Sequence, residues 1–496
     1  MRHYFIHILL ISAVAFVNHA AARAQAAGVV ELTLDDAVAR ARAASVDAAV
    51  ALDELRSAYW EYRTYRAELL PEVTFEATLP HYAKQYSTYM DSNGAFSFVR
   101  TNYLEAVGQL SLTQNIWLTG GTLSLSTSLD LIKEFDSGSR NRFMSIPVAL
   151  TLNQPVFGVN NVKWNRRISP VRYEEAKAAF LSATEDVAMN AITYYFNLLM
   201  ADEDVATARQ NLANAEKLYS VAQEKREMGR ISKNDLLQME LNLLNARATL
   251  TDAESTRKSA MFQLASFLDL EEDAELRPVV PAMVPDVEVT FADALDKALA
   301  NNKFAKNLRR RQLEADYEVA KAKGDMRQIN LYAQVGYTGA GHNAGDSYRS
   351  LRDNQVVEVG VRIPLIDWGK RRGRVRVAQS NREVVQSRLR KETQDFNRDL
   401  FVLVERFANQ GEQVRIALRA DTIASQRYRT NVETYLIGKI STLDLNDSQA
   451  SKDDSRRQYI SNLYRYWSYY YQLRSLTLWD YERREPLTAD FEKILK

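Results

Sequence analysis

A short turn sequence that occurs twice is the feature that most limits how this chain can fold. Residues 229–238 read GRISKNDLLQ, and residues 438–447 read GKISTLDLND. In each copy a glycine, which tolerates the left-handed conformation that ends a helix, precedes a Ser-x-x-Asp capping box, which begins the next helix. Each copy therefore predicts a helix that ends near the glycine and a second helix that starts near Ser232 or Ser441.

The two turns lie in two halves of the chain with matched internal spacing. Gly438 follows Gly229 by 209 residues, and Pro364 of a PLIDWG segment follows Pro155 of a PVFG segment by the same 209 residues. Long helical segments cannot absorb insertions freely, so equal spacing argues for an internal duplication rather than for chance.

Each half is predicted to contain the same helices in the same order. They are expected over residues 35–69, 165–228 and 233–268, and again over 292–326, 374–437 and 442–478. The long helix of each half, at about 64 residues, would measure about 96 Å. In 233–268 apolar residues recur at alternating steps of three and four, which is typical of a coiled-coil seam.

Strands with one apolar face are predicted between these helices. The expected ranges are 73–79, 104–112, 123–131, 146–152, 331–337 and 357–365. Thr290 follows Thr33 in a similar segment by 257 residues, which is 48 more than the offset of 209 between the later landmarks. The first half therefore carries a 48-residue insertion, which includes a hairpin at about 103–133. Such strands fit a soluble sandwich or a membrane β-barrel. We favour a barrel shared between chains, because four to six strands cannot enclose a lumen alone.

The composition excludes several kinds of site. The chain has no cysteine, which rules out a thiol nucleophile, a disulfide, a thiolate metal site and a lipidated N-terminal cysteine. A net charge of +1 provides no field to attract nucleic acid. No convergent set of titrating groups suggests catalysis, so we expect no enzyme, no cofactor and no metal.

Five segments are predicted along the chain. Residues 1–24 combine an early arginine, an apolar stretch and an Ala-Arg-Ala cleavage motif, which is the pattern of a signal peptide. A first repeat over 25–270 and a second over 290–480 are separated by a linker at 271–289 that contains three prolines, and a tail follows at 481–496.

The duplicated order of helix, strands, long helix, glycine turn and return helix resembles the TolC family of outer-membrane efflux proteins. The motifs that carry the resemblance are NQPVFG at 153–158, MGRIS at 228–232 and IGKIS at 437–441. The resemblance implies an α+β membrane protein in which three chains build one shared β-barrel in the outer membrane of a Gram-negative bacterium. A coaxial α-helical barrel of coiled-coil hairpins would cross the periplasm.

The function implied is that of a passive exit duct in a tripartite efflux or type I secretion system, carrying small molecules or peptides. The implied partners are two further copies of the chain, a periplasmic adaptor (membrane fusion protein), an inner-membrane pump of the RND or ABC type, and outer-membrane lipid. The family usually has twelve barrel strands. The inserted hairpin would either raise this number or fold elsewhere, and the sequence leaves both open.

The resemblance also assigns roles to the two turns. Rings of aspartate that narrow the periplasmic mouth in the family correspond to Asp444 and Asp447. In a trimer these carboxylates would lie close together, and each would raise the pKa of its neighbours. Asp444 has an alternative role as the acidic residue of the Ser441 capping box. Ile440 stands where a family member has a basic gate residue. Contact with the adaptor is assigned to Gly229, Ile231, Ser232, Gly438, Ile440 and Ser441, whose isoleucines are expected to be exposed; turn chemistry alone is the alternative.

A dense basic run begins the second long helix, where the helix dipole disfavours cations. It consists of Lys370, Arg371, Arg372 and Arg374. Something should therefore compensate these charges. At a junction between barrel and helices they would face lipid phosphates, and a solvated helix face is the alternative.

Two other classes of protein compete with the duct. A soluble periplasmic coiled-coil adaptor or scaffold without a channel would carry one helical hairpin beside a lipoyl-like β domain, not two hairpins at equal spacing. An enzyme on a helical scaffold would need the convergent titrating groups that the sequence lacks.

Overall fold

The computed structural model describes residues 30–90, 96–135, 140–271, 274–281, 284–326, 328–362, 366–437 and 439–495. The predicted signal peptide and Gly438 lie outside the described residues. The chain divides into two compact units. One contains residues 1–55, 177–302 and 395–496, and the other contains residues 56–176 and 303–394.

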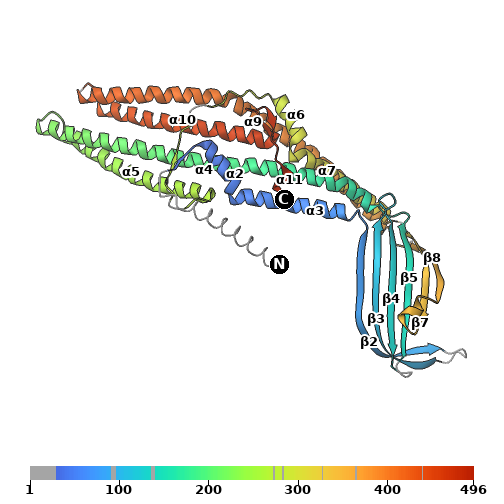
Figure 1. Cartoon of the computed structure of the whole chain (residues 1–496). Coiled ribbons are helices and arrows are strands. Elements are labelled where there is room, and N and C mark those ends of the chain that lie inside the picture. The colour runs from blue at the N-terminus through green and yellow to red at the C-terminus, as the bar shows by residue number, and fades with distance from the viewer. Residues whose placement is uncertain are drawn as a thin grey trace. The chain divides into compact units, whose positions relative to one another are not determined.

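The second unit contains one antiparallel sheet of six strands (Figure 1). Its spatial order is β2-β3-β4-β5-β7-β8. The strands are β2 (Glu72–Met90), β3 (Phe96–Asn115), β4 (Thr122–Glu134), β5 (Arg140–Pro155), β7 (Gln328–Gly341) and β8 (Leu351–Arg362). All six predicted strands are present, and residues 363–365 of the last predicted range lie outside the described residues. The inserted hairpin forms β3 and β4 in the interior of the sheet, so it does not fold elsewhere.

The register gives the sheet one apolar and one polar face. Directly paired residues such as Val73 and Leu112, or Leu125 and Leu150, lie on the same face, and so do Leu331 and Val359. The opposite face pairs hydroxyls, and the side chains of Thr74 and Ser111 are hydrogen-bonded at 2.6 Å. Large apolar side chains on the first face stay exposed, 65% for Val73 and 73% for Val357. A sheet with one exposed apolar face suits a membrane better than water.

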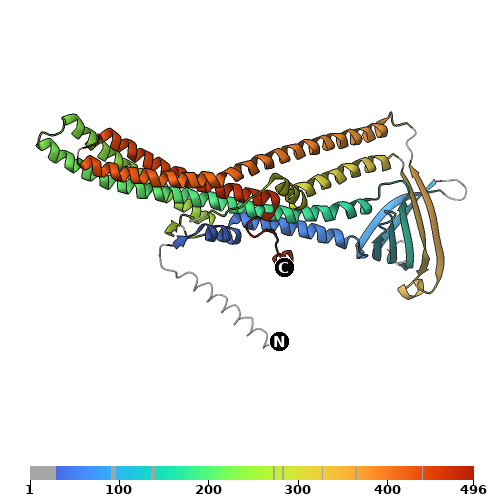
Figure 2. The same ribbon diagram turned by 90° about the horizontal axis from the view of Figure 1, so that it is seen from above.

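The first unit contains most of two long helical hairpins. They consist of α4 (Asn161–Glu227) with α5 (Lys233–Phe267), and α9 (Lys370–Leu436) with α10 (Thr442–Thr477). Both long helices have 67 residues, which confirms the predicted long helices. Figures 1 and 2 show α5 beside α4 and α10 beside α9. Ion pairs such as Arg257–Asp202 at 2.6 Å join α5 to α4, and Arg456–Glu203 at 2.7 Å joins α10 to α4.

The prediction of unbroken helices over 35–69 and 292–326 was wrong. The first is divided into α2 (Leu34–Ala44) and α3 (Val46–Ala67), and the second into α6 (Phe291–Asn301) and α7 (Lys303–Gly324). Ser45 and Asn302 separate them with extended ψ angles of 149°. Both are buried, and their side chains bond backbone groups: Ser45 Oγ accepts from Ala48 N at 3.2 Å, and Asn302 Nδ2 donates to the Leu476 carbonyl at 2.6 Å. The Ser45 bond is local and the Asn302 bond is a tertiary contact, and each offers the backbone an alternative to a continuous helix.

The core of the first unit lies where α2 and α6 pack with the middle of the hairpins. Alanines and aromatic side chains dominate it, among them Ala191, Tyr195, Phe407 and Tyr470. Beside it, β1 (Val30–Leu32) pairs in parallel with β6 (Leu276–Pro278). Of the two strands, β6 belongs to the predicted linker at 271–289. The remaining elements are short: α8 (Ala344–Ser347) in the second unit, and β9 (Trp479–Asp480), β10 (Glu485–Pro486) and α11 (Phe491–Ile494) in the first.

None of the described helices is both long enough and apolar enough to cross a bilayer.

Candidate functional site

The turn between α4 and α5 closes in the way that its glycine predicts. Gly229 has φ +69°, and a Cβ built on it would meet nothing within 4 Å. The amide of Arg230 donates to the Lys225 carbonyl at 2.8 Å, and that of Gly229 donates to the Arg226 carbonyl at 2.9 Å. These two bonds form a Schellman motif. In the second turn, Lys439 N donates to the Thr434 carbonyl at 3.1 Å, which is the matching outer bond.

Both predicted capping boxes are confirmed. In the first, Asp235 N donates to Ser232 Oγ at 3.1 Å, and Ser232 N donates to Asp235 Oδ2 at the same distance. In the second, Ser441 and Asp444 make the same two bonds at 3.2 Å each. The hydrogen bonds from Ser441, together with the charge of Arg427, hold the pKa of the Asp444 carboxyl below its ordinary value. Within one chain, therefore, the cap favours the ionised form of Asp444.

Asp447 has a partner that the sequence analysis missed. Its Oδ2 accepts from Arg427 Nη2 at 2.7 Å, and both side chains are more than half exposed. Arg427 and Asp447 stand ten residues before and after Ile437 in an antiparallel hairpin. Counting outward from the turn would have located this pair. It holds one carboxylate at the tip without burying it.

The expectation that the two isoleucines are exposed was wrong. Ile231 and Ile440 are partly buried against a small apolar cluster under the turns, made by Leu218, Ala222, Met239, Tyr428 and Leu445. They join the two turns into one packed tip. The exposed apolar side chains are instead Met228 at 59%, Ile437 at 67% and Leu443 at 77%. Exposed apolar groups at a hairpin end mark a contact surface better than buried ones do.

The described members of the predicted tip set therefore lie together: Gly229, Ile231, Ser232, Ile440 and Ser441, with Asp444 and Asp447. They belong to one end of the two hairpins, where two turns, two caps and three exposed apolar side chains meet. The arrangement leaves apolar side chains and the Asp447 carboxylate exposed at the same end of the hairpins.

The basic run lies in the other unit, at the start of α9. Asp367 compensates it: its carboxylate accepts from Gly369 N at 2.9 Å and from Arg371 N at 3.2 Å. These backbone bonds, first that of Arg371, lower the pKa of Asp367. The sequence predicted that something would oppose these cations but did not identify Asp367, which lies three residues before the first residue of α9.

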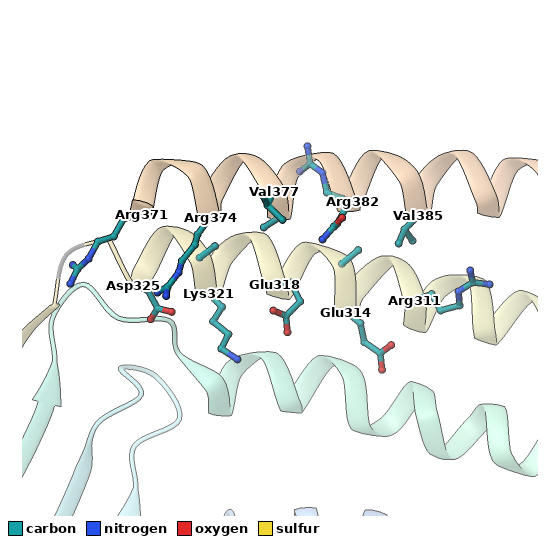
Figure 3. Close-up of a pocket in the computed structure, with 14 residues that line it drawn as sticks. Arg311, Glu314, Glu318, Lys321, Asp325, Arg371, Arg374, Val377, Arg382 and Val385 are labelled. Carbon is teal, nitrogen blue, oxygen red and sulfur yellow. The ribbon is translucent and has the colours of Figure 1, made fainter. Parts of the chain in front are cut away.

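A groove of about 580 Å³ runs between α7 and the first turns of α9. Arg371 and Arg374 lie at its end with Asp325, and Val377 and Val385 form part of its wall (Figure 3). Arg371 Nη1 donates to the Met326 carbonyl at 2.9 Å. The residues that line the groove carry both signs of charge, since Glu314, Glu318 and Lys321 are among them. Contact of the basic run with lipid phosphates stays a prediction.

Comparison with known proteins connects this architecture to one family. The family model described as outer membrane efflux protein matches residues 37–268 and 294–477. A comparison with curated protein sequences found no match.

Several solved structures share the fold. The outer-membrane channel OprN is 14% identical over 90% of this chain and 89% of its own, with a TM-score of 0.65. The Campylobacter jejuni CmeC outer membrane channel is 15% identical over 93% and 88%, with a TM-score of 0.64. The open state of the Neisseria gonorrhoeae MtrE outer membrane channel is 13% identical over 92% and 91%, with a TM-score of 0.58. With two matched segments that cover most of both halves, the chain belongs to the outer membrane efflux protein family.

Proposed function

We propose that this outer membrane efflux protein works as a homotrimer that carries cargo passively, without catalysis, from a periplasmic adaptor and an inner-membrane pump to the exterior. Its role as an exit duct in the Gram-negative outer membrane follows from its family. The observation that carries the trimer is the sheet, which has six strands and one apolar face. Its two edge strands, β2 and β8, each pair with one neighbour and leave the other side without a partner among the described strands.

An open sheet cannot persist in a bilayer, because each unpaired backbone group there costs several kcal/mol. Six strands are also too few to enclose a lumen, since about eight only just enclose side chains. Pairing of β2 in one copy with β8 in the next removes both edges. Three copies would then supply eighteen strands, a number at which barrels leave an aqueous channel.

The tip of the hairpins is our proposed adaptor contact. The turn residues Gly229, Ile231, Ser232, Gly438, Ile440 and Ser441 would shape it. The exposed Met228, Ile437 and Leu443 would supply the apolar area that a partner buries. The first two are equivalent in the two repeats, so one adaptor surface could engage both turns. The basic run of Lys370, Arg371, Arg372 and Arg374 would face lipid phosphates.

Asp444 and Asp447 are our proposed gate at the periplasmic mouth. In a trimer they would form two rings of three carboxylates, which select and bind cations. Like-charge repulsion would then oppose the pKa lowering that Ser441 causes within one chain. The pump, of the RND or ABC type, would determine which small molecules or peptides enter.

Single-channel conductance in a planar bilayer tests this proposal. The wild type is compared with Asp444→Asn/Asp447→Asn while divalent cations are added on the periplasmic side. Asp235→Asn is the matched control, because it weakens the equivalent capping box of the first turn without changing either proposed ring. We expect small cation-selective steps that divalents block in the wild type and the control, but not in the double variant.

Equal block by divalent cations in all three proteins would support the duct but contradict the gate. Asp444 and Asp447 would then serve only in helix capping and ion pairing. A well-folded oligomer that forms no channel would contradict the duct itself and support a soluble scaffold. Cross-linking of the purified protein gives the copy number, and any number other than three would contradict the trimer.

A further inference from the structure

The hairpin of β2 and β3 extends beyond the rest of the sheet. Pairing between β3 and β4 begins only at Tyr103, opposite Glu134, and Phe135 N donates to the Asn102 carbonyl at 2.9 Å. Apart from that bond, residues 83–90 and 96–102 form ladder pairs only with each other among the described residues. We call them the distal arm. Figure 1 shows the arm bending away from the direction of the strands at the end of the sheet opposite the helices.

The arm has one strongly apolar face. Its register pairs Met90 with Phe96, Thr88 with Phe98 and Tyr86 with Arg100, so these residues share one face. Exposure there is 69% for Tyr86, 57% for Met90, 72% for Phe96 and 76% for Phe98. Water alone is an unfavourable environment for so much contiguous aromatic surface.

Both cations of the arm lie on this same face. Lys84 pairs with Asn102, and Arg100 pairs with Tyr86, two residues further along each strand. The arm contains no acidic residue between 83 and 90 or between 96 and 102. Gln85, paired with Thr101, belongs to the opposite face. Aromatic and cationic side chains on one face, with no acid, form the pattern of a strand that lies at a lipid headgroup surface.

The face continues the apolar face of the sheet. An irregularity between Thr78 and His81 adds one residue to β2, so the face that carries Val73 and Phe75 continues through Tyr82. The stretch 73–82 has about the nine to eleven residues that a tilted strand needs to cross a bilayer. The arm therefore begins where the hydrocarbon ends, on the side away from the helices.

We propose that the distal arm lies on the outer leaflet of the outer membrane. Its aromatic side chains would sit among the headgroups, and Lys84 and Arg100 would bind the phosphates of anionic lipid. The proposal rests on the proposed function for its orientation, because the helices must lie on the periplasmic side. A second copy is a poorer occupant, since two cations with no acidic residue between 83 and 90 or between 96 and 102 favour an anionic partner, and the chain itself has a net charge of +1.

Site-specific labelling tests the proposal, and a chain without cysteine allows a single label at each chosen position. Phe98→Cys reports the aromatic face, Gln85→Cys the opposite face, and Leu125→Cys the apolar face of the sheet. Each carries an environment-sensitive fluorophore in vesicles of phosphatidylethanolamine with phosphatidylglycerol. Quenching by a brominated acyl chain is compared with quenching by aqueous iodide.

We expect the label at 98 to be quenched by lipid and protected from iodide, and the label at 85 to show the reverse. In the Phe98→Cys background, Lys84→Gln/Arg100→Gln should weaken docking by about thirtyfold, since each cation near an anionic surface contributes about fivefold. Phosphatidylcholine vesicles should remove most of this difference.

The label at 125 separates two kinds of failure. If it is quenched by lipid while the labels at 98 and 85 are both open to iodide, the sheet spans the membrane and the arm proposal is wrong. If 125 is also open to iodide, the membrane duct itself is wrong. Spontaneous disulfides between copies of unlabelled Phe98→Cys, together with no lipid quenching of the labelled protein, would contradict the lipid contact and favour a second copy as the partner of the arm.

Discussion

Glu185 should be the most sensitive charged position in the helical unit. Only 3% of the residue is exposed, and its carboxylate accepts from Arg42 Nη2 at 2.5 Å and from Arg474 Nε at 3.0 Å. Arg474 is also paired with Asp480 at 2.8 Å. Burial works against the charged guanidinium, but the neighbouring carboxylates keep the pKa of Arg474 above its ordinary value. The network thus joins α2, α4, α10 and the segment after α10.

Glu185→Gln keeps the shape of the side chain and removes its charge. Removing one partner of a buried pair costs about 3–5 kcal/mol, because the remaining charge stays desolvated. Since Arg474 keeps Asp480, we expect the lower end, about 3 kcal/mol of local opening free energy. At tenfold per 1.4 kcal/mol, backbone amides around residues 181–199 and 470–480 should exchange with solvent roughly a hundredfold faster.

Hydrogen exchange followed by mass spectrometry measures this difference. Asp204→Asn is the matched control, because Asp204 and Arg457 form a more exposed pair at 2.8 Å between the same two helices. Such a pair contributes at most about 1 kcal/mol. If Glu185→Gln accelerates exchange no more than Asp204→Asn does, the reasoning from burial is refuted.

Three further changes test other parts of the structure. Gly229→Ala should destabilise the tip by about 1–2 kcal/mol, because the φ of Gly229 is +69° while no neighbouring atom lies within 4 Å of an added Cβ. Gly411→Ala inside α9 should stabilise that helix by about 1 kcal/mol. The two variants should therefore shift the temperature of thermal unfolding in opposite directions. Tyr195 is buried and donates to the Leu32 carbonyl, and burial raises its pKa from 10.0 to about 12. The stabilisation by its neutral hydroxyl is therefore complete below pH 10 and is lost as the pH rises towards 12. Tyr195→Phe should reduce the loss of stability at alkaline pH, and an unchanged dependence of stability on pH would contradict this. Asn302→Ala should cost about 1–3 kcal/mol, since the carbonyls of Ser475 and Leu476 lose a buried donor, and faster exchange near them would show it.

The regular elements could be predicted because their signals are local and repeated. Gly229 and Ser232 determine where one helix ends and the next begins, and alternate apolar residues determine each strand face. The breaks at Ser45 and Asn302 could not be found in this way. Ser45 is buried and accepts a bond from Ala48 N three residues on, whereas Asn302 gains its partners from α10, more than 170 residues later in the chain. A helix of good local propensity gives no sign that tertiary contacts will interrupt it.

The sequence predicted which residues form the candidate site, but not which of their apolar side chains are exposed. Sequence spacing identified the capping residues, yet it assigned exposure to Ile231 and Ile440, which pack inward against Leu445 and its neighbours. Met228, Ile437 and Leu443 take the exposed positions instead. Which apolar side chain of a tight turn faces outward depends on how two hairpins pack against each other, and that information is absent from either turn alone.

The inserted hairpin shows how a sequence pattern can decide between two locations that spacing leaves open. In β4, Leu123, Leu125, Leu129 and Leu131 alternate with serines and Asp130. A hairpin lying outside the sheet would expose that leucine row to water on its own, whereas a place inside the sheet adds it to the apolar rows of β3 and β5. The hydroxyl row must then join the polar face, and the side chains of Ser124 and Thr113 are indeed hydrogen-bonded at 3.1 Å. The alternation of leucine with serine therefore favours six strands per chain and, in a closed barrel, a lumen lined partly by serine and threonine.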